Sequence, residues 1–432
     1  MSATQAAIDH EAVAALADEP LDWRFKAIPV SAWGKTAGGF LAERPRLADL
    51  GTPLLTLDAP ALEANLAAMA AYCAEAGVEL APHGKTTMAP ELWSRQLAAG
   101  ARGITVANVP QVRVARAFGV RRIYLANALV DADALRWISA ELDADPSFEF
   151  SCWVDSKRGA ETIYNVLRHR EAYWPMNVFI ELGAPGRRTG VRTVDEAVEI
   201  AQAIATLPML RLVGVAGYEG VLGHDASPGS LEAVRGYLHR LAELHSRLLA
   251  SGLYSSDVDT VWLTAGGSAF FDQVVDVLGP LAGPGVKVLL RSGAYLIHDD
   301  GFYAGISPFS RGIGKPLTSA MHGWARVLSR PESGLALLDG GKRDFPFDEG
   351  LPTPQRLHRA ASVTAIADQH TFLKFDPLEF DPHGEPEPAV GDVVRFGLSH
   401  PCTAFDKWSM IPVVDDASAA DPRVVGLVRT YF

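Results

Sequence analysis

The chain has 432 residues, which is more than one typical domain contains and enough for two. Hydrophobic residues make up 48% and charged residues 21%, an ordinary balance for a globular protein with large cores. The net charge of −12 argues against nucleic acid or an anionic membrane as the main partner, because both require a basic surface.

The N-terminus and the cysteines predict a soluble, cytoplasmic protein. Residues 1–20 have neither the basic region nor the apolar core of a signal peptide. No apolar run approaches the ~20 residues of a membrane-spanning helix. The three cysteines, Cys73, Cys152 and Cys402, are too few and too far apart for a disulfide framework.

Residues 1–50 are expected to form an irregular extension associated with a later β domain. After them, strands and helices begin to alternate. A helix over 61–76 ends at Gly77, a typical stop signal. Further helices are expected at 91–99, 194–205 and 230–249. The nine strand candidates lie at 54–57, 78–81, 104–106, 122–125, 148–154, 178–181, 212–216, 261–264 and 288–290.

This alternation predicts a parallel sheet built from right-handed βαβ units. Eight of the nine strands would close a TIM-like (β/α)8 barrel, and the ninth would belong elsewhere. A doubly wound open sheet has the same alternation, so the rhythm alone leaves both architectures open.

Beyond residue 315 the pattern changes to β segments separated by turns. Segments of this kind lie at 322–328, 335–338, 361–367, 393–396, 409–414 and 424–431. No helix is expected between them, which predicts a second, mostly antiparallel β domain. The expected division is therefore an extension (1–50), a barrel (51–315) and a β domain (316–432).

Lys85 lies in the segment 82–87, directly after a predicted strand. Active sites of parallel α/β folds form at the carboxyl ends of strands. A lysine that is partly desolvated there has a lowered pKa and a nucleophilic amine. A solvated surface lysine is the alternative, and only the neighbouring motifs disfavour it.

Three further clusters follow predicted strands and suit an anionic ligand. Gly266, Gly267 and Ser268 form a turn whose N–H groups can cradle a phosphate. Arg188 lies in a glycine-rich loop, and Tyr218 can hold a ligand through its hydroxyl group. Plain turns, solvated arginines and a packed tyrosine explain each cluster equally well in isolation.

His400 and Cys402 lie in the predicted β domain, two residues apart. In an extended segment this spacing places both side chains on one side, where imidazole and thiolate are ligands that zinc accepts. Chance explains a single pair of this kind. His298 and Asp299 are other possible ligands, but an exposed polar loop explains them equally well.

Taken in order, these motifs resemble the D-threonine aldolase and D-serine dehydratase-like family. This family comprises fold-type III pyridoxal-phosphate enzymes with an alanine-racemase-like N-terminal barrel. The resemblance covers about residues 51–430, and its order of motifs is specific. It rests on 51–53, 82–86, 188–191, 214–218, 266–268, 291–295, 338–341 and 400–402.

The resemblance implies a role for each candidate residue. Lys85 matches the catalytic lysine that binds the cofactor covalently, and Gly266, Gly267 and Ser268 match its phosphate-binding turn. Arg188 and Tyr218 match positions around the pyridine ring. His400 and Cys402 match the ligands of a divalent metal, expected to be zinc. The family also implies the barrel, a β domain and a homodimer.

The sequence departs from the family pattern at three places, one of which is the N-terminal 50 residues, for which the family has no clear counterpart. Thr87 and Met88 follow the lysine motif where many relatives have histidine and lysine, and 268–270 reads Ser-Ala-Phe where Thr-Pro-Thr is common. These departures leave the substrate open among D-serine, D-threonine and 3-hydroxy-D-aspartate.

Cysteine beside histidine favours zinc over harder cations. Within the family that the chain resembles, this pair is similar to the dehydratase branch, which releases a keto acid and ammonia. An aldolase that releases glycine and an aldehyde is the main alternative. The second alternative is a non-catalytic pyridoxal-phosphate-binding protein, which the β domain and the metal pair disfavour.

Overall fold

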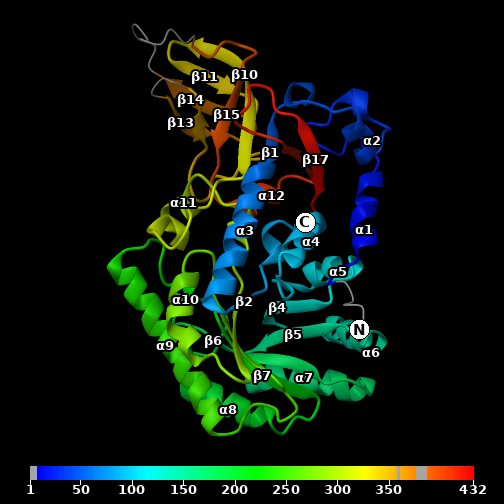
Figure 1. The fold of residues 1–432 in the computed structure, drawn as a ribbon, viewed down its shortest axis with the longest axis vertical. Coiled ribbons are helices and arrows are strands. Elements are labelled where there is room, and N and C mark those ends of the chain that lie inside the picture. The colour runs from blue at the N-terminus through cyan, green and yellow to red at the C-terminus, as the bar shows by residue number, and fades with distance from the viewer. Residues whose placement is uncertain (1–6, 358–360, 376–386) are drawn as a thin grey trace.

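Two sheets organise the protein, as the computed structural model shows for residues 7–357, 361–375 and 387–432 (Figure 1). The first sheet has eight strands, all paired in parallel. They are β2 (Glu79–Leu80), β3 (Ile104–Val106), β4 (Arg122–Ala128), β5 (Glu149–Val154), β6 (Met176–Leu182), β7 (Leu210–Gly217), β8 (Val261–Ala265) and β9 (Val286–Leu290).

Backbone hydrogen bonds close this sheet into a barrel. The strand order is β2-β9-β8-β7-β6-β5-β4-β3, so β2 and β3 are its two ends. Arg102 N donates to Leu80 O at 2.7 Å, and Thr105 N donates to Pro82 O at 2.9 Å. Because these bonds join the two ends, the predicted TIM-like barrel is confirmed and the open sheet is excluded.

Helices connect the parallel strands, as the crossover geometry requires. The helix that precedes the first barrel strand begins where the Asp58 side chain accepts a hydrogen bond from Ala61 N, and it ends at Gly77, whose φ of 65° is left-handed. The main helices are α3 (Ala59–Ala76), α4 (Pro90–Ala98), α5 (Val109–Ala117), α6 (Ala132–Ala144), α7 (Lys157–Arg170), α8 (Val194–Ile204), α9 (Pro228–Ala250) and α10 (Phe271–Leu278).

Large side chains fill the barrel. Trp153, Phe179 and Trp262 form a buried cluster with Tyr124 and Leu289. They come from five different strands, because every second residue of a barrel strand points inward. The other residues of these strands pack against the surrounding helices.

The second sheet is mostly antiparallel. Its main path is β13-β14-β11-β10-β1-β16-β17, and β15 pairs with both β10 and β12. Its strands are β1 (Leu54–Asp58), β10 (Met321–Glu332), β11 (Leu335–Leu338), β12 (Thr353–Gln355), β13 (Ala361–Ile366), β14 (Thr371–Phe375), β15 (Val393–Gly397), β16 (Met410–Val414) and β17 (Val424–Arg429).

The ninth strand candidate, β1, belongs to this second sheet. It pairs antiparallel with β10 and parallel with β16. The N-terminal segment packs on the same sheet, where Leu21, Phe25 and Phe40 share a buried cluster with Trp324 and Val424. In Figure 1 its helix α2 (Ala37–Ala42) lies beside the C-terminal strand β17, whereas its helix α1 (His10–Ala14) packs against α4 of the barrel.

The expectation that no helix lies between the β segments beyond residue 315 is wrong. Helix α11 (Phe302–Ile306) precedes this region, but α12 (Pro401–Phe405) lies within it, between β15 and β16. Proline at its first position explains why, since it lacks an N–H for a strand ladder and its fixed φ suits a helix start.

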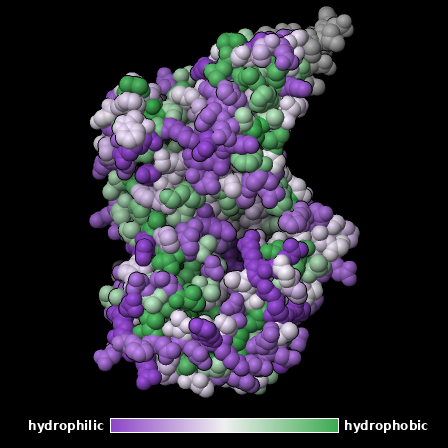
Figure 2. Space-filling view, turned by 180° about the vertical axis from the view of Figure 1, so that it is seen from behind, coloured by the Kyte–Doolittle hydropathy of each residue, from purple (hydrophilic) through white to green (hydrophobic). Residues whose placement is uncertain are grey.

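No helix in the described part of the chain is both long and apolar enough to cross a membrane. On the face drawn in Figure 2, hydrophilic residues cover much of the surface, with smaller hydrophobic groups between them.

Candidate active site

One cavity collects every residue that the sequence singled out as a site residue. Its volume is about 280 Å³, and it opens at the carboxyl ends of the barrel strands. Lys85, Arg188, Tyr218, Gly266, Gly267, Ser268, His400 and Cys402 all line it. Six of these residues follow barrel strands, and His400 and Cys402 lie between β15 and β16 of the second sheet. The cavity therefore lies where the barrel meets the second sheet.

Lys85 follows β2 in a single 3-10 turn, Gly84–Thr86. Burial lowers the pKa of Lys85, the nearby Cys402 opposes this shift, and the charges of Arg188 and Arg291 lower the pKa further. A larger fraction of the amine is therefore neutral than in a solvated lysine, and a neutral amine is nucleophilic.

Arg188 and Tyr218 approach one another from different loops. The guanidinium carbon of Arg188 lies 5.1 Å from the centre of the Tyr218 ring. Burial raises the pKa of Tyr218, and the charge of Glu219 adds to the shift. Tyr218 therefore remains a neutral hydrogen-bonding group at the cavity wall.

The glycine turn after β8 differs in detail from the expectation. Gly266 N and Gly267 N donate to the two carboxylate oxygens of Glu219 at 3.0 and 2.7 Å. These two N–H groups are therefore not free to bind an anion. Phosphate binding at the turn remains a prediction, to which Ser268 on the cavity wall would contribute its hydroxyl group.

The cavity also contains charged residues that were not assigned a role from sequence. Arg291 follows β9 and donates to Thr264 Oγ1 and to Gly217 O, both at 2.6 Å. Burial raises the pKa of Glu181 to about 7. The position of Arg291 directly after a predicted strand is the signal that could have identified it.

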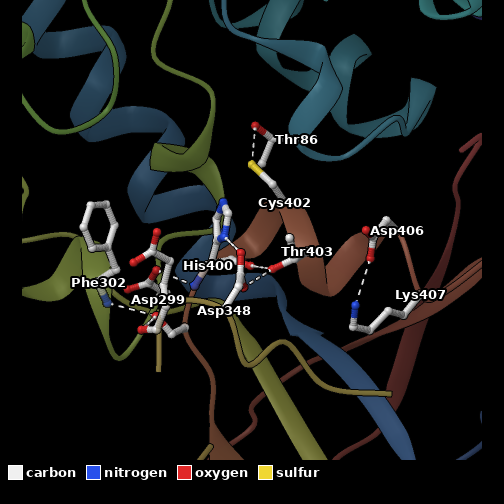
Figure 3. A network of polar contacts seen from close by, with 11 residues as sticks. Thr86, Asp299, Phe302, Asp348, His400, Cys402, Thr403, Asp406 and Lys407 are labelled. Atoms are coloured by element: carbon white, nitrogen blue, oxygen red, sulfur yellow. Dashed lines mark hydrogen bonds and ion pairs between the residues drawn. The ribbon is translucent and has the colours of Figure 1, made fainter. Parts of the chain in front are cut away.

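His400 and Cys402 are held at the start of α12 (Figure 3). The expected extended segment is wrong, because His400 is the N-cap residue with a φ of 54° and Cys402 lies in the first helical turn. The turn still places both side chains on the wall of the same cavity. Cys402 Sγ also forms a hydrogen bond with Thr86 Oγ1 at 3.6 Å.

The surroundings of Cys402 favour its thiolate. Burial raises the pKa of Cys402, but hydrogen bonds with His400 and Thr86 and the charges of His400 and Lys85 lower it below its ordinary value. Burial likewise lowers the pKa of His400, and its contacts with Cys402 and Asp348 outweigh burial and raise it to about 9. A thiolate beside an imidazole is a donor set for zinc.

Of the two interpretations left open for Asp299, a possible ligand or an exposed loop residue, exposure is excluded, since only 1% of its surface is accessible. Its carboxylate accepts hydrogen bonds from Tyr303 N at 2.8 Å and from His400 N at 2.9 Å. It is therefore tied to the backbone of α11 and of His400.

The cavity residues fit pyridoxal phosphate. Arg188, Arg291 and Lys85 gather positive charge in a protein whose net charge is −12. His83 lines the cavity, and its buried Nδ1 has no hydrogen-bond partner in the described residues. A Cβ on Gly267 would lie 2.7 Å from Tyr218 Cε2, so the wall has no room for a side chain there.

A parallel barrel with a lysine after its first strand, joined to a second, mostly antiparallel β sheet, is the arrangement of fold-type III pyridoxal-phosphate enzymes. Residues 57–268 match the family model "Alanine racemase, N-terminal domain". Residues 320–414 match the model "Putative serine dehydratase domain".

Known enzymes are similar to the chain in amino-acid sequence. A D-threonine aldolase from Arthrobacter sp. is 27% identical over 87% of this chain and 92% of its own length. The D-threo-3-hydroxyaspartate dehydratase of Delftia sp. is 31% identical over 44% of this chain and 48% of its own.

Solved structures extend the comparison to the whole fold. The crystal structure of D-threonine aldolase from Filomicrobium marinum is 26% identical, covers 90% of this chain and 97% of its own, and has a TM-score of 0.73. A Cys→Ala mutant of D-threo-3-hydroxyaspartate dehydratase in the metal-free form has a TM-score of 0.68 at 22% identity. The match covers 90% of this chain and 99% of that one.

The chain belongs to the D-threonine aldolase and D-serine dehydratase-like family of fold-type III pyridoxal-phosphate enzymes.

Proposed function

We propose that the protein is a pyridoxal-phosphate- and metal-dependent dehydratase of 3-hydroxy D-amino acids such as D-serine or D-threonine. The products are a keto acid and ammonia. The observation that carries this proposal is the His400–Cys402 pair, which lines the same cavity as Lys85. A cytoplasmic homodimer is part of the proposal and rests on the family resemblance and the sequence.

When bound, the cofactor withdraws electrons from the substrate Cα and so makes loss of the α-proton feasible. Lys85 would hold it covalently, Ser268 would contact its phosphate, and Arg188 and Tyr218 would flank its ring. Lys85 Nζ would also be the group that accepts the α-proton, since burial favours its uncharged amine.

His400 and Cys402 would bind a divalent metal, for which zinc suits the imidazole and thiolate donors. Its Lewis acidity would stabilise the departing β-hydroxide. In the described residues no group of three or more His, Cys, Asp or Glu side chains is placed to hold a metal. Two protein ligands leave coordination positions for the substrate, as a catalytic metal requires.

Retro-aldol cleavage to glycine and an aldehyde is the second candidate. It is favoured by similarity, because the Arthrobacter relative that spans 87% of the chain is a D-threonine aldolase. The two reactions differ in the bond that breaks. Removing the hydroxyl proton leads to Cα–Cβ cleavage, whereas removing the α-proton and the hydroxide leads to dehydration.

Product analysis separates the two candidates. The holoenzyme is incubated with D- and L-forms of serine, threonine and 3-hydroxyaspartate, and keto acid, ammonia, glycine and aldehyde are quantified. Keto acid and ammonia in equal amounts from D-substrates support the dehydratase, whereas glycine and aldehyde overturn it in favour of the aldolase. EDTA should abolish turnover but leave the visible absorption band of the cofactor unchanged. Added zinc should then restore turnover.

A further inference from the structure

Asp348 connects to the His400 segment through two hydrogen bonds (Figure 3). Its Oδ2 lies 2.6 Å from His400 Nδ1, and its Oδ1 accepts a hydrogen bond from Thr403 Oγ1 at 2.7 Å. The neighbouring Glu349 O accepts a hydrogen bond from Ser399 Oγ at 2.8 Å. The loop that carries Asp348 is therefore fastened to residues on both sides of His400.

This contact decides which imidazole nitrogen can bind a metal. An ionised carboxylate only accepts hydrogen bonds, so Nδ1 carries the proton that it donates to Asp348. The other nitrogen, Nε2, is then the one that keeps a lone pair. His400 would therefore coordinate a metal through Nε2, in the cavity that it shares with Cys402.

The backbone of His400 is fixed as well. His400 N donates to Asp299 Oδ2 at 2.9 Å, and this interaction holds His400 at its φ of 54°. Few residues other than glycine adopt this left-handed conformation without support. One carboxylate thus fixes the backbone and another fixes the ring, so the imidazole cannot rotate away from Cys402 without losing a hydrogen bond.

We infer that Asp348 is a positioning residue of the metal centre, which orients His400 and sets its tautomer without coordinating the metal itself. This inference rests on the proposed function, because it assumes that His400 and Cys402 bind a metal. Direct coordination by Asp348 is disfavoured, since both of its oxygens already contact protein groups and no three-residue ligand group occurs in the described residues. Carboxylates in this role raise the basicity of the imidazole and restrict its orientation.

The test measures zinc affinity instead of activity. Cofactor-loaded protein is stripped of metal and titrated with zinc against a chromophoric chelator. Asp348→Ala should raise the Kd for zinc about 10- to 100-fold, the range typical of such partners. Asp348→Asn should weaken zinc binding less, because its amide oxygen can still accept a hydrogen bond from the Nδ1–H group of His400. Asp406→Ala is the matched control, since Asp406 caps the same helix and pairs with Lys407 instead.

The thermal unfolding midpoint and the cofactor absorption are recorded for each variant, so a loss of fold is seen directly. Excess zinc should restore turnover of Asp348→Ala, because both metal ligands remain. An unchanged Kd in a folded Asp348→Ala overturns the inference. If the Asn and Ala variants lose zinc affinity equally and strongly, Asp348 coordinates the metal directly, and the inference is likewise overturned. Wild-type protein that binds no zinc refutes the metal centre of the proposed function, and the positioning role with it.

Discussion

The reactivity expected of Lys85 depends on its surroundings at the end of β2. Burial lowers its pKa, and two arginines in the same cavity favour its neutral form. Cys402 contributes in the opposite direction, because a nearby thiolate stabilises the ammonium. Lysines on the protein surface lack this combination and keep their charge at neutral pH.

Lys85 should therefore be the lysine that binds pyridoxal phosphate. Borohydride reduction of the yellow holoenzyme, followed by peptide mapping, should place the label on Lys85. Lys85→Ala should lose the stable visible absorption band, whereas Lys287→Ala, which removes a half-exposed lysine paired with Glu79, should retain it. A label on any other lysine would contradict the assignment.

Gly267 provides a test of the cavity wall. In Gly267→Val the new side chain would meet the Tyr218 ring, since even a Cβ would lie 2.7 Å from Tyr218 Cε2. We expect cofactor affinity to fall at least about tenfold, equivalent to about 1.4 kcal/mol. Gly283→Val is the control, because a Cβ there meets no atom within 4 Å. Fluorescence titration of the apoenzyme with pyridoxal phosphate measures both variants, and equal affinities would refute the placement.

Individual residues differ in how well sequence predicts them. Lys85 and Gly267 lie in short motifs directly after strands, so their place in the cavity follows from the strand pattern. Asp348 and Glu219 act through contacts with residues about 50 positions away in sequence. Nothing local in the chain distinguishes these two carboxylates from the other acidic residues.

At the scale of elements, the turn after β8 depends on the segment after β7. Glu219 begins the 3-10 turn Glu219–Val221 and is completely buried. It accepts the N–H groups of Gly266 and Gly267, which are adjacent on the next loop. This pair of hydrogen bonds connects two consecutive barrel loops and fixes the glycine turn.

Glu219→Gln should reduce the free energy of unfolding by about 1–3 kcal/mol, because its NH2 group would face a backbone N–H and leave that donor unpaired. Urea denaturation of the apoenzyme measures the change. Glu232→Gln on α9 is the control, since Glu232 is exposed. A Glu219→Gln variant as stable as this control would show that the two hydrogen bonds do not stabilise the turn.

Regular elements were predictable where the hydrophobic pattern was strong. The eight barrel strands were all expected from their apolar runs, and the helix α3 ends at Gly77 as its stop signal indicated. The short strands β12 and β14 and the helix α12 were missed. Each is only three to five residues long, so tertiary contacts outweigh local preference in forming them.

At the scale of the whole molecule, the barrel and the antiparallel sheet share one junction, which also contains the cavity. The sequence predicted both parts but could not assign β1, whose apolar run suits either sheet. Helix α4 of the barrel packs against β17 at this junction. There Glu91 Oε1 accepts a hydrogen bond from Arg429 N at 3.1 Å, while its Oε2 is buried and has no partner in the described residues.

This junction should lose stability as the pH rises, because of Glu91. Burial raises the pKa of Glu91 to about 7, from an ordinary value of 4.5 in the unfolded chain. The folded protein therefore binds more protons than the unfolded chain between these pH values. The stability that Glu91 contributes is fully present below pH 4.5 and is lost as the pH rises through 7.

Glu91→Gln removes this titration, since an amide does not ionise but can still accept the hydrogen bond from Arg429 N. At pH 8 the variant should be more stable than the wild type by roughly 1–3 kcal/mol, the range that such a pKa shift implies. The difference should disappear near pH 4.5, where Glu91 is largely protonated in the folded wild type. Denaturation at several pH values measures it, with the exposed Glu75→Gln on α3 as the control. A gain independent of pH would mean that side-chain packing, and not ionisation of Glu91, limits the stability of the junction.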